Sequence, residues 1–223
     1  MRAVVLAAGQ GVRLEPLTHT RPKCMLPIAG RPLLEWIFEA LAEAGISEAL
    51  LILNPKGEAV KKAYGASWKR LKLTYAWDEN PRGTGASLTY AESYVGSDVF
   101  LLVYGDLFLT PRTLKFFVEK GKQGLEGGFS AIAAAAEVSN PSEYGVFQLR
   151  GDGSLQRVLE KPRSPPSNLA NAGIYLLGPE VFEAVRKVKP SPRGEIELTD
   201  ALNFMVKGWK IGVVKLPQGS WID

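Results

Sequence analysis

The sequence predicts an α/β fold with a mixed, mostly parallel central sheet flanked by helices. Short apolar runs, such as Val4 to Ala7, alternate with helical patterns over the first half of the chain. Such alternation is typical of parallel strands joined by helical crossovers. The run Val99 to Tyr104 is apolar on both faces, which places it at the centre of the sheet. From Phe129 onward, strands separated by short turns indicate hairpins instead of crossovers.

Length and composition agree with a folded globular chain. The 223 residues are 46% hydrophobic and 22% charged, and this length fits one large domain or two small ones with a substantial core. The net charge is +4, but lysines and arginines are spread along the chain. This pattern favours a small anionic ligand over nucleic acid. No run approaches the roughly 18 apolar residues of a membrane span, so we expect no membrane partner and a cytoplasmic location.

The chain has one cysteine and one histidine, Cys24 and His19. These counts exclude an internal disulfide and a metal site made of several histidines. Cys24 follows Lys23, which leaves a catalytic thiolate open, but the apolar neighbours Met25 and Leu26 favour a buried core thiol.

The first half of the chain predicts strands and helices in alternation. Thr84 is a candidate cap of the third helix. In chain order the expected elements are a strand at Val4 to Ala7, a helix from Pro32 to Ala44, a strand at Ala49 to Leu53, a helix at Lys56 to Tyr64, a strand at Leu71 to Trp77, a helix from about Ala86 to Val95 and a strand at Val99 to Tyr104.

The second half predicts a β-rich region followed by two helices and a final strand. Pro162 to Pro166 is expected to be an ordered loop, because strands needing partners lie on both sides. No element is assigned to residues 107–128. The expected elements are strands at Phe129 to Val138, Gly145 to Arg150, Leu155 to Glu160 and Ala172 to Leu177, helices at Glu180 to Val188 and about Glu197 to Val206, and a strand at Lys210 to Leu216.

The segment after the first strand has the layout of a phosphate-binding loop. Gly9 and Gly11 allow backbone N–H groups to approach a polyphosphate, and Arg13 and Lys23 supply positive charge. The dinucleotide fingerprint fails because Leu14 stands where its third glycine is required, and the spacing of a Walker A loop is absent. A simple tight turn explains the glycines but leaves the two cations unexplained.

Taken together, the ordered motifs resemble the sugar-1-phosphate nucleotidylyltransferase family, and within it the catalytic domain of archaeal-type glucose-1-phosphate thymidylyl- and uridylyltransferases. The matches run from one end of the chain to the other. They are Leu6-Ala7-Ala8-Gly9-Gln10-Gly11-Val12-Arg13-Leu14, Pro16-Leu17-Thr18, Pro22-Lys23-Cys24-Met25-Leu26-Pro27, Gly83-Thr84-Gly85-Ala86, Gly105-Asp106, Tyr144-Gly145-Val146, Glu160-Lys161-Pro162, Asn171-Ala172-Gly173-Ile174-Tyr175, Arg193 to Asp200, and Trp221-Ile222-Asp223.

This resemblance implies a Rossmann-like nucleotidyltransferase fold with a small additional β-rich substrate subregion. Residues 1–223 would form one domain, with a nucleotide-binding half at 1–128 and a sugar-phosphate-binding half at 129–223. Relatives often continue into a left-handed β-helix after the position of Asp223. Homo-oligomerisation stays open.

The reaction implied couples UTP or dTTP to glucose-1-phosphate or N-acetylglucosamine-1-phosphate, which gives a nucleotide sugar and pyrophosphate. An alternative is a non-catalytic nucleotide-sugar-binding regulatory subunit on the same fold. The retained Arg13, Lys23, Asp106 and Asp223 favour the enzyme. A nicotinamide dehydrogenase is disfavoured by Leu14.

The resemblance also assigns roles to individual residues. Arg13, Lys23 and Asp106 would be catalytic, and Asp106 with Asp223 would hold Mg²⁺. Many relatives have a glutamine at Asp78, so the base is left open, and a solvated surface acid is the alternative there. Nucleotide contacts fall on Leu6, Ala7, Ala8, Gly9, Gln10, Gly11, Arg13, Lys23, Asp78, Gly83 and Thr84. Sugar-phosphate contacts fall on Tyr144, Gly145, Glu160, Lys161 and Asn171.

Overall fold

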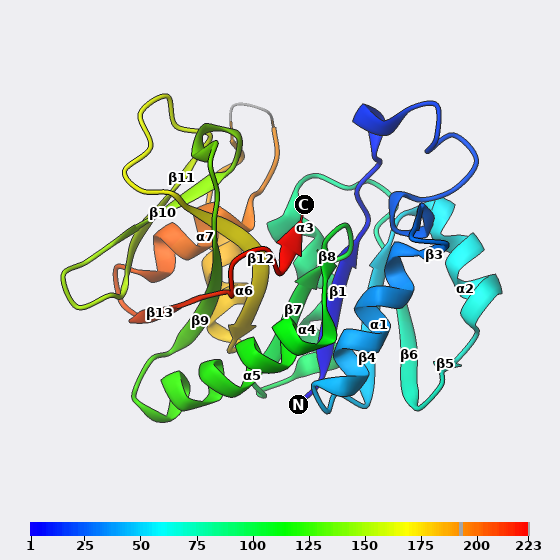
Figure 1. Cartoon of the computed structure of the whole chain (residues 1–223), viewed down its shortest axis with the longest axis horizontal. Helices are drawn as coiled ribbons and strands as arrows, with labels where there is room; N and C mark the ends of the chain where they lie inside the picture. Colours follow the sequence, from blue (N-terminus) through cyan, green and yellow to red (C-terminus); the bar gives the residue numbers. More distant parts are fainter. Residues whose placement is uncertain (192–193, 223) are drawn as a thin grey trace.

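A ten-stranded mixed sheet forms the centre of the molecule, and a computed structural model describes it for residues 1–191 and 194–222 (Figure 1). Its main path runs in the order β11-β10-β12-β7-β1-β4-β6-β5, and β9 and β13 extend it beside β12. Four strands of the N-terminal half are mutually parallel. These are β1 (Ala3–Ala7), β4 (Glu48–Leu53), β6 (Leu71–Trp77) and β7 (Phe100–Tyr104). The predicted fold class is confirmed.

The C-terminal half adds strands that are mostly antiparallel to their neighbours, as the short predicted turns require. The parallel pairing of β13 with β9 is the exception. The strands are β9 (Ala131–Glu137), β10 (Gly145–Leu149), β11 (Leu155–Glu160), β12 (Leu169–Leu177) and β13 (Ile211–Lys215). Short strands β2 (Pro27–Ile28) with β3 (Arg31–Pro32), β8 (Phe108–Leu109) with β14 (Trp221–Ile222), and β5 (Ser67–Trp68) complete the set.

Helices cover both faces of the sheet, which explains why the central strands are apolar on both sides. One face packs against α1 (Leu33–Glu43), α2 (Glu58–Tyr64) and α5 (Pro111–Glu126), and Figure 1 shows α1 and α5 side by side. The other face packs against α3 (Thr84–Leu88), α4 (Glu92–Val95), α6 (Glu180–Lys187) and α7 (Leu198–Met205). Within the described ranges, no helix has both the length and the apolar character needed to cross a bilayer.

Two sequence expectations differ from the structure. The longest helix, α5, occupies residues for which no element was predicted. Gly121 and Gly124 lower its helix propensity, but an added Cβ there would lie 2.6 Å from Leu176 and Ile132, so these glycines let α5 approach the sheet closely. The predicted helix from Ala86 to Val95 is instead interrupted between α3 and α4.

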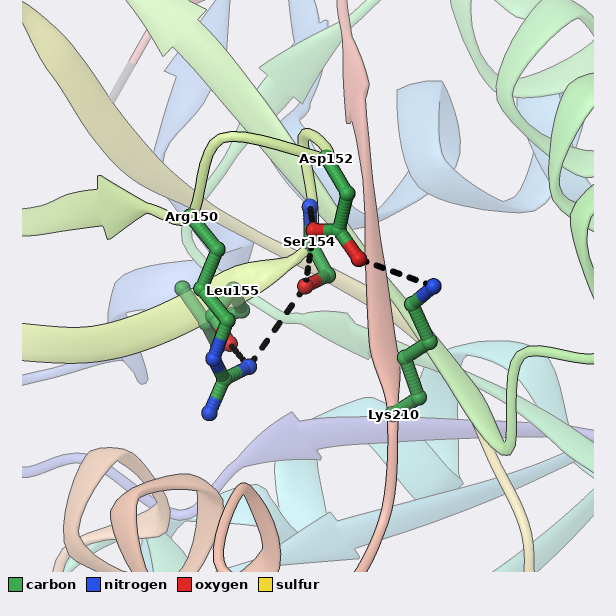
Figure 2. Close-up of polar contacts among 5 residues, drawn as sticks. All are labelled: Arg150, Asp152, Ser154, Leu155 and Lys210. Atoms are coloured by element: carbon green, nitrogen blue, oxygen red, sulfur yellow. Dashed lines mark hydrogen bonds and ion pairs between the residues drawn. The ribbon is translucent and has the colours of Figure 1, made fainter.

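The β10–β11 hairpin is tied to its neighbours by a polar cluster (Figure 2). Asp152 accepts hydrogen bonds from the backbone and hydroxyl of Ser154 and forms an ion pair with Lys210, 2.9 Å away. The Lys210 ammonium and the Ser154 bonds hold the pKa of the Asp152 carboxyl well below its usual range. Arg150 donates to the carbonyls of Leu155 and Val206. These charges therefore hold the hairpin against β13 and the end of α7.

The direction of the strands locates the most favourable edge for a ligand. From β1 the chain passes to β4 and β6 on one side and then returns to β7 on the other. The strand order thus reverses at β1, and open α/β sheets bind ligands beyond the carboxyl ends of strands at such a point. The loops after β1 and β7 meet there.

Candidate active site

A large open cleft lies at this edge, with a volume of about 1420 Å³. Its lining includes eight of the residues to which the sequence assigns roles. These are Gly9, Gln10, Gly11, Arg13, Lys23, Asp106, Tyr144 and Lys161. Residues from the first and the second half of the chain therefore share one cavity.

The glycine loop after β1 is held from behind by Asn54, a residue that the sequence analysis did not single out. The Asn54 amide donates to the carbonyls of Ala8 and Gly9 at 2.9 and 3.3 Å. Its own carbonyl accepts from the backbone N–H of Lys56 at 3.0 Å. The signal available in the sequence was an asparagine directly after a predicted strand; the structure shows it buried, where its side chain needs hydrogen-bond partners.

The glycine loop is also fastened to the segment that carries Lys23. The buried hydroxyl of Thr18 donates to the carbonyl of Gly11 at 2.9 Å, and the Lys56 ammonium donates to the carbonyl of Thr18 at 3.1 Å. Arg13 sits in the short helical turn Val12–Leu14 that follows Gly11 and is exposed. Its guanidinium has no hydrogen bond or ion pair to any described residue and is available to an anion.

Lys23 and Asp106 are in direct contact. The Lys23 Nζ donates to the Asp106 Oδ2 at 2.7 Å, although 83 positions separate them in the chain. Asp106 reaches this position because the backbone N–H of Gly105 donates to the carbonyl of Leu6 at 2.7 Å, which ties the end of β7 to the end of β1. The structure thus brings together one cation and one anion that the resemblance assigns to the reaction.

Cys24 packs in the core beneath this pair and is 2% exposed. Burial raises the pKa of its thiol to about 12. This agrees with the preferred interpretation of a core thiol, since a catalytic thiolate needs a lowered pKa.

The raised thiol pKa gives a first testable expectation. At pH 8 a thiol with such a pKa is deprotonated in only about 10⁻⁴ of molecules, so Cys24 is expected to react with iodoacetamide far more slowly than a free thiol. Mass spectrometry of the native chain over time measures this rate, with the urea-unfolded chain as the control. Rapid alkylation of the folded chain would contradict the buried placement.

The Gly83–Thr84 segment is shaped by the backbone of Ile196. The backbone N–H of Gly85 donates to the carbonyl of Ile196 at 2.8 Å, and that of Ile196 donates to the carbonyl of Arg82 at 2.7 Å. Thr84 is not the helix cap that the sequence suggests. Its hydroxyl oxygen instead accepts from the backbone N–H of Leu198 at 3.0 Å, at the start of α7. Ile196 and Leu198, which belong to the Arg193 to Asp200 motif, therefore support the Gly83–Thr84 segment.

Gly83 requires both a glycine conformation and the absence of a side chain. Its φ is +105°, and an added Cβ would lie 2.4 Å from the carbonyl oxygen of Ile196. Gly83→Ala is therefore expected to lower the free energy of unfolding by roughly 2–4 kcal/mol. Gly208→Ala is the matched control, since its Cβ would meet nothing within 4 Å. Equal urea midpoints for the two variants would contradict the close approach at Gly83.

Asp78 lies beneath the same loop and is 3% exposed. Its Oδ2 accepts from the Ser87 hydroxyl at 2.6 Å, and its Oδ1 accepts from the backbone N–H of Asn80 at 3.2 Å. The alternative of a solvated surface acid is therefore wrong. Asp78 anchors the loop to α3 and does not line the cleft, so its contact with a base stays a prediction.

The predicted sugar-phosphate residues gather at the junction of β10, β11 and β12. Gly145 pairs with Glu160 across the hairpin, and a Cβ on Gly145 would lie 3.0 Å from the Glu160 Oε2 and 3.6 Å from the Asn171 Cβ. The backbone N–H of Lys161 donates to the carbonyl of Tyr144 at 3.0 Å. Lys161 has a φ of +43°, an uncommon value for a residue with a side chain, and such conformations concentrate at binding sites.

The last described residues pack beside Asp106. Ile222 and Trp221 pair with Phe108 and Leu109 as strands β14 and β8, and Figure 1 shows β14 next to β8. The Trp221 Nε1 donates to the carbonyl of Ala172 at 2.9 Å. Asp223, the second expected Mg²⁺ ligand, lies outside the described residues.

A hard divalent cation fits the cleft through Asp106. The Asp106 Oδ2 accepts from Lys23, and the Asp106 Oδ1 has no hydrogen bond within the described part of the chain. Mg²⁺ often takes only one or two protein carboxylates and completes its shell with water and phosphate oxygens. Across residues 1–191 and 194–222 no group of three His, Cys, Asp or Glu side chains could hold a metal.

Comparisons with known proteins agree with these features. The family model "Nucleotidyl transferase" matches residues 2–223. The chain is 38% identical to a bifunctional sugar-1-phosphate nucleotidylyltransferase/acetyltransferase of Sulfurisphaera tokodaii, over 100% of this chain and 52% of the relative. It is 36% identical to a glucose-1-phosphate thymidylyltransferase of Streptomyces antibioticus, over 100% of this chain and 62% of the relative.

A solved structure is similar over the same length. The structure of a UDP-glucose pyrophosphorylase complexed with UDP-glucose matches with a TM-score of 0.89 and 27% identity, over 100% of this chain and 92% of that one. The two relatives above are longer, and the chain spans about half to three fifths of their length. A family model that matches almost the whole chain is decisive, and the chain belongs to the nucleotidyl transferase family.

Proposed function

We propose that the protein transfers a nucleotidyl group from UTP or dTTP to glucose-1-phosphate or N-acetylglucosamine-1-phosphate and releases pyrophosphate. The contact between Lys23 and Asp106 inside the cleft carries this proposal. This contact supports the proposal because a cation and a carboxylate that could bind a metal line the same cleft as Gly9, Gly11 and Lys161. A regulatory subunit that only binds a nucleotide sugar would not require this pair.

The proposed reaction needs positioning and charge neutralisation more than covalent catalysis. A phosphate oxygen of the sugar-1-phosphate attacks the α-phosphorus of the triphosphate, and the bond from that phosphorus to the bridging oxygen breaks as pyrophosphate leaves. The attacking oxygen is already nucleophilic, so no protein nucleophile or general base is required. This agrees with a cleft that the single histidine and the buried Cys24 do not line.

In this proposal, three cationic side chains of the protein each bind a different phosphate group. Arg13 is exposed, unpaired among the described residues and planar, which suits a bidentate grip on the leaving phosphates. Lys23 is held by Asp106 and can neutralise the triphosphate nearer to the reacting phosphorus. Lys161 lines the same cleft from the opposite half of the chain and would bind the phosphate of the sugar.

Enzymes of this class work with a divalent metal ion, and we propose Mg²⁺. Asp106 would hold it, together with Asp223. When bound, the cation would draw negative charge from the phosphate oxygens. The proposal also assigns nucleotide binding to residues 1–128 and sugar-phosphate binding to residues 129–223. It further includes a cytoplasmic location and small-molecule partners. The proposal includes no nucleic-acid partner.

A substrate grid tests the proposal. Pyrophosphate release is measured for each pairing of UTP, dTTP, ATP, CTP and GTP with several sugar-1-phosphates, with Mg²⁺ or with a chelator. We expect the highest rates with UTP or dTTP, and we expect the chelator to abolish them. Lack of turnover in every pairing would refute the proposed function.

A further inference from the structure

Strand β12 contains an irregularity that joins two polar side chains. The pairing of β12 with β9 shifts register between Asn171 and Tyr175. Gly173 lies between them with a φ of +69°, and an added Cβ there would lie 2.7 Å from the Tyr104 ring. Residues four apart in a regular strand lie roughly 13 Å apart. Here the bulge brings the Tyr175 hydroxyl to 2.7 Å from the Asn171 Oδ1.

The hydrogen bonds around Asn171 fix which end of its carboxamide faces the protein. The backbone N–H of Gly173 lies 3.2 Å from the Oδ1, and a backbone N–H can only donate. The carboxamide oxygen of Asn171 therefore faces Gly173, and it also accepts a hydrogen bond from Tyr175. The amide nitrogen has no hydrogen bond to any described residue and is not among the buried unpaired atoms. The amide nitrogen is therefore free to donate, and the Asn171 Cβ lies on the side of Gly145, 3.6 Å from the position that a Cβ on Gly145 would take.

Tyr175 is well suited to hold this orientation. It is fully buried, and burial raises the pKa of its phenol well above the usual range, so the hydroxyl keeps its proton. The hydroxyl of Tyr104 lies 3.5 Å away, too far to compete with the 2.7 Å bond to Asn171. The single proton of Tyr175 is thus directed to the Asn171 oxygen.

We propose that Tyr175 is a positioning residue for the sugar phosphate: it holds the Asn171 carboxamide so that only N–H donors face the substrate. This rests on the proposed function, in which Asn171 bonds to the sugar. The sugar group that faces Asn171 must then be a hydrogen-bond acceptor, such as a hydroxyl oxygen or an acyl carbonyl. An ammonium group at that position of the sugar has no lone pair to offer and is rejected.

A double-mutant cycle tests this role. Tyr175→Phe keeps the ring and removes only the hydroxyl. It is expected to raise the KM for the sugar-1-phosphate about fivefold and to leave the KM for the nucleoside triphosphate unchanged. Asn171→Ala removes the group that Tyr175 orients, so adding Tyr175→Phe to it should have no further effect. Dissociation constants of the nucleotide-sugar product, measured by calorimetry, provide the same cycle independently of turnover.

Tyr94→Phe is the matched control, because the Tyr94 hydroxyl is buried and has no hydrogen-bond partner among the described residues. It should change neither KM. An equal effect of Tyr175→Phe with and without Asn171 would show a purely structural role and overturn the proposal, as would an equal rise in both KM values. If the wild type is active and Tyr175→Phe leaves the KM for the sugar-1-phosphate unchanged, this inference alone is overturned. No turnover by the wild type would refute the proposed function as well.

Discussion

Replacing Asp106 by asparagine is expected to lower kcat by roughly 10²–10³-fold while the fold stays intact. The asparagine keeps the shape of the side chain and can still accept from Lys23, but it loses the negative charge that would attract a divalent cation. The Asp106 side chain is 36% exposed, so the core does not depend on it. The measurement is kcat at saturating UTP or dTTP and sugar-1-phosphate, over a range of Mg²⁺ concentrations.

Asp98→Asn is the control for this substitution. Asp98 is 70% exposed, its ion-pair distance to Arg2 is 4.0 Å, and it lies outside the cleft. Its removal should leave kcat unchanged, and urea midpoints of both variants should match the wild type within error. An Asp106→Asn enzyme with wild-type kcat would remove Asp106 from the metal site.

Arg13→Ala is expected to lower kcat by roughly 10²-fold without loss of stability. The exposed guanidinium has no hydrogen bond or ion pair to any described residue, so its removal is expected to change the stability of the free protein little. Its proposed contact is with phosphates that gain charge as the bond to the α-phosphorus breaks. Arg13→Lys should recover only part of the activity, because an ammonium cannot form the bidentate contact.

Arg112→Ala supplies the comparison, since Arg112 is an exposed arginine on α5 outside the cleft. Its kcat should equal that of the wild type. If Arg13→Ala raised only the KM for the triphosphate and left kcat unchanged, Arg13 would bind the ground state without stabilising the transition state.

Much of the fold could be predicted because its signals are local. The apolar runs at β1, β4 and β7 identify central strands, and the pattern after Pro32 identifies α1. The helix α5 shows where this reasoning fails. Its glycines are explained only by tertiary contacts with the sheet: Gly121 lies against Leu176, far away in the sequence, and Gly124 lies against Ile132 on the next strand.

The candidate site likewise has parts that the sequence predicts and parts that it does not. Its motifs name Arg13 and Asp106, and the structure places both in one cleft. The contacts that support these residues cannot be derived from a motif. Asn54 holds the glycine loop from another strand, and Ile196 shapes the Gly83 segment through its backbone, which no side-chain pattern can encode. The bond from Tyr175 to Asn171 depends on a strand bulge that appears only when β12 pairs with β9.

The pairing of β14 with β8 has a consequence for how the protein is made. Ile222 pairs with Phe108, so one wall of the cleft joins segments that leave the ribosome far apart in time. The sheet strands β1, β4, β6 and β7 can assemble earlier, because all of them precede Gly105. A nascent chain stalled before Trp221 would thus hold most of its core but lack this wall of the cleft.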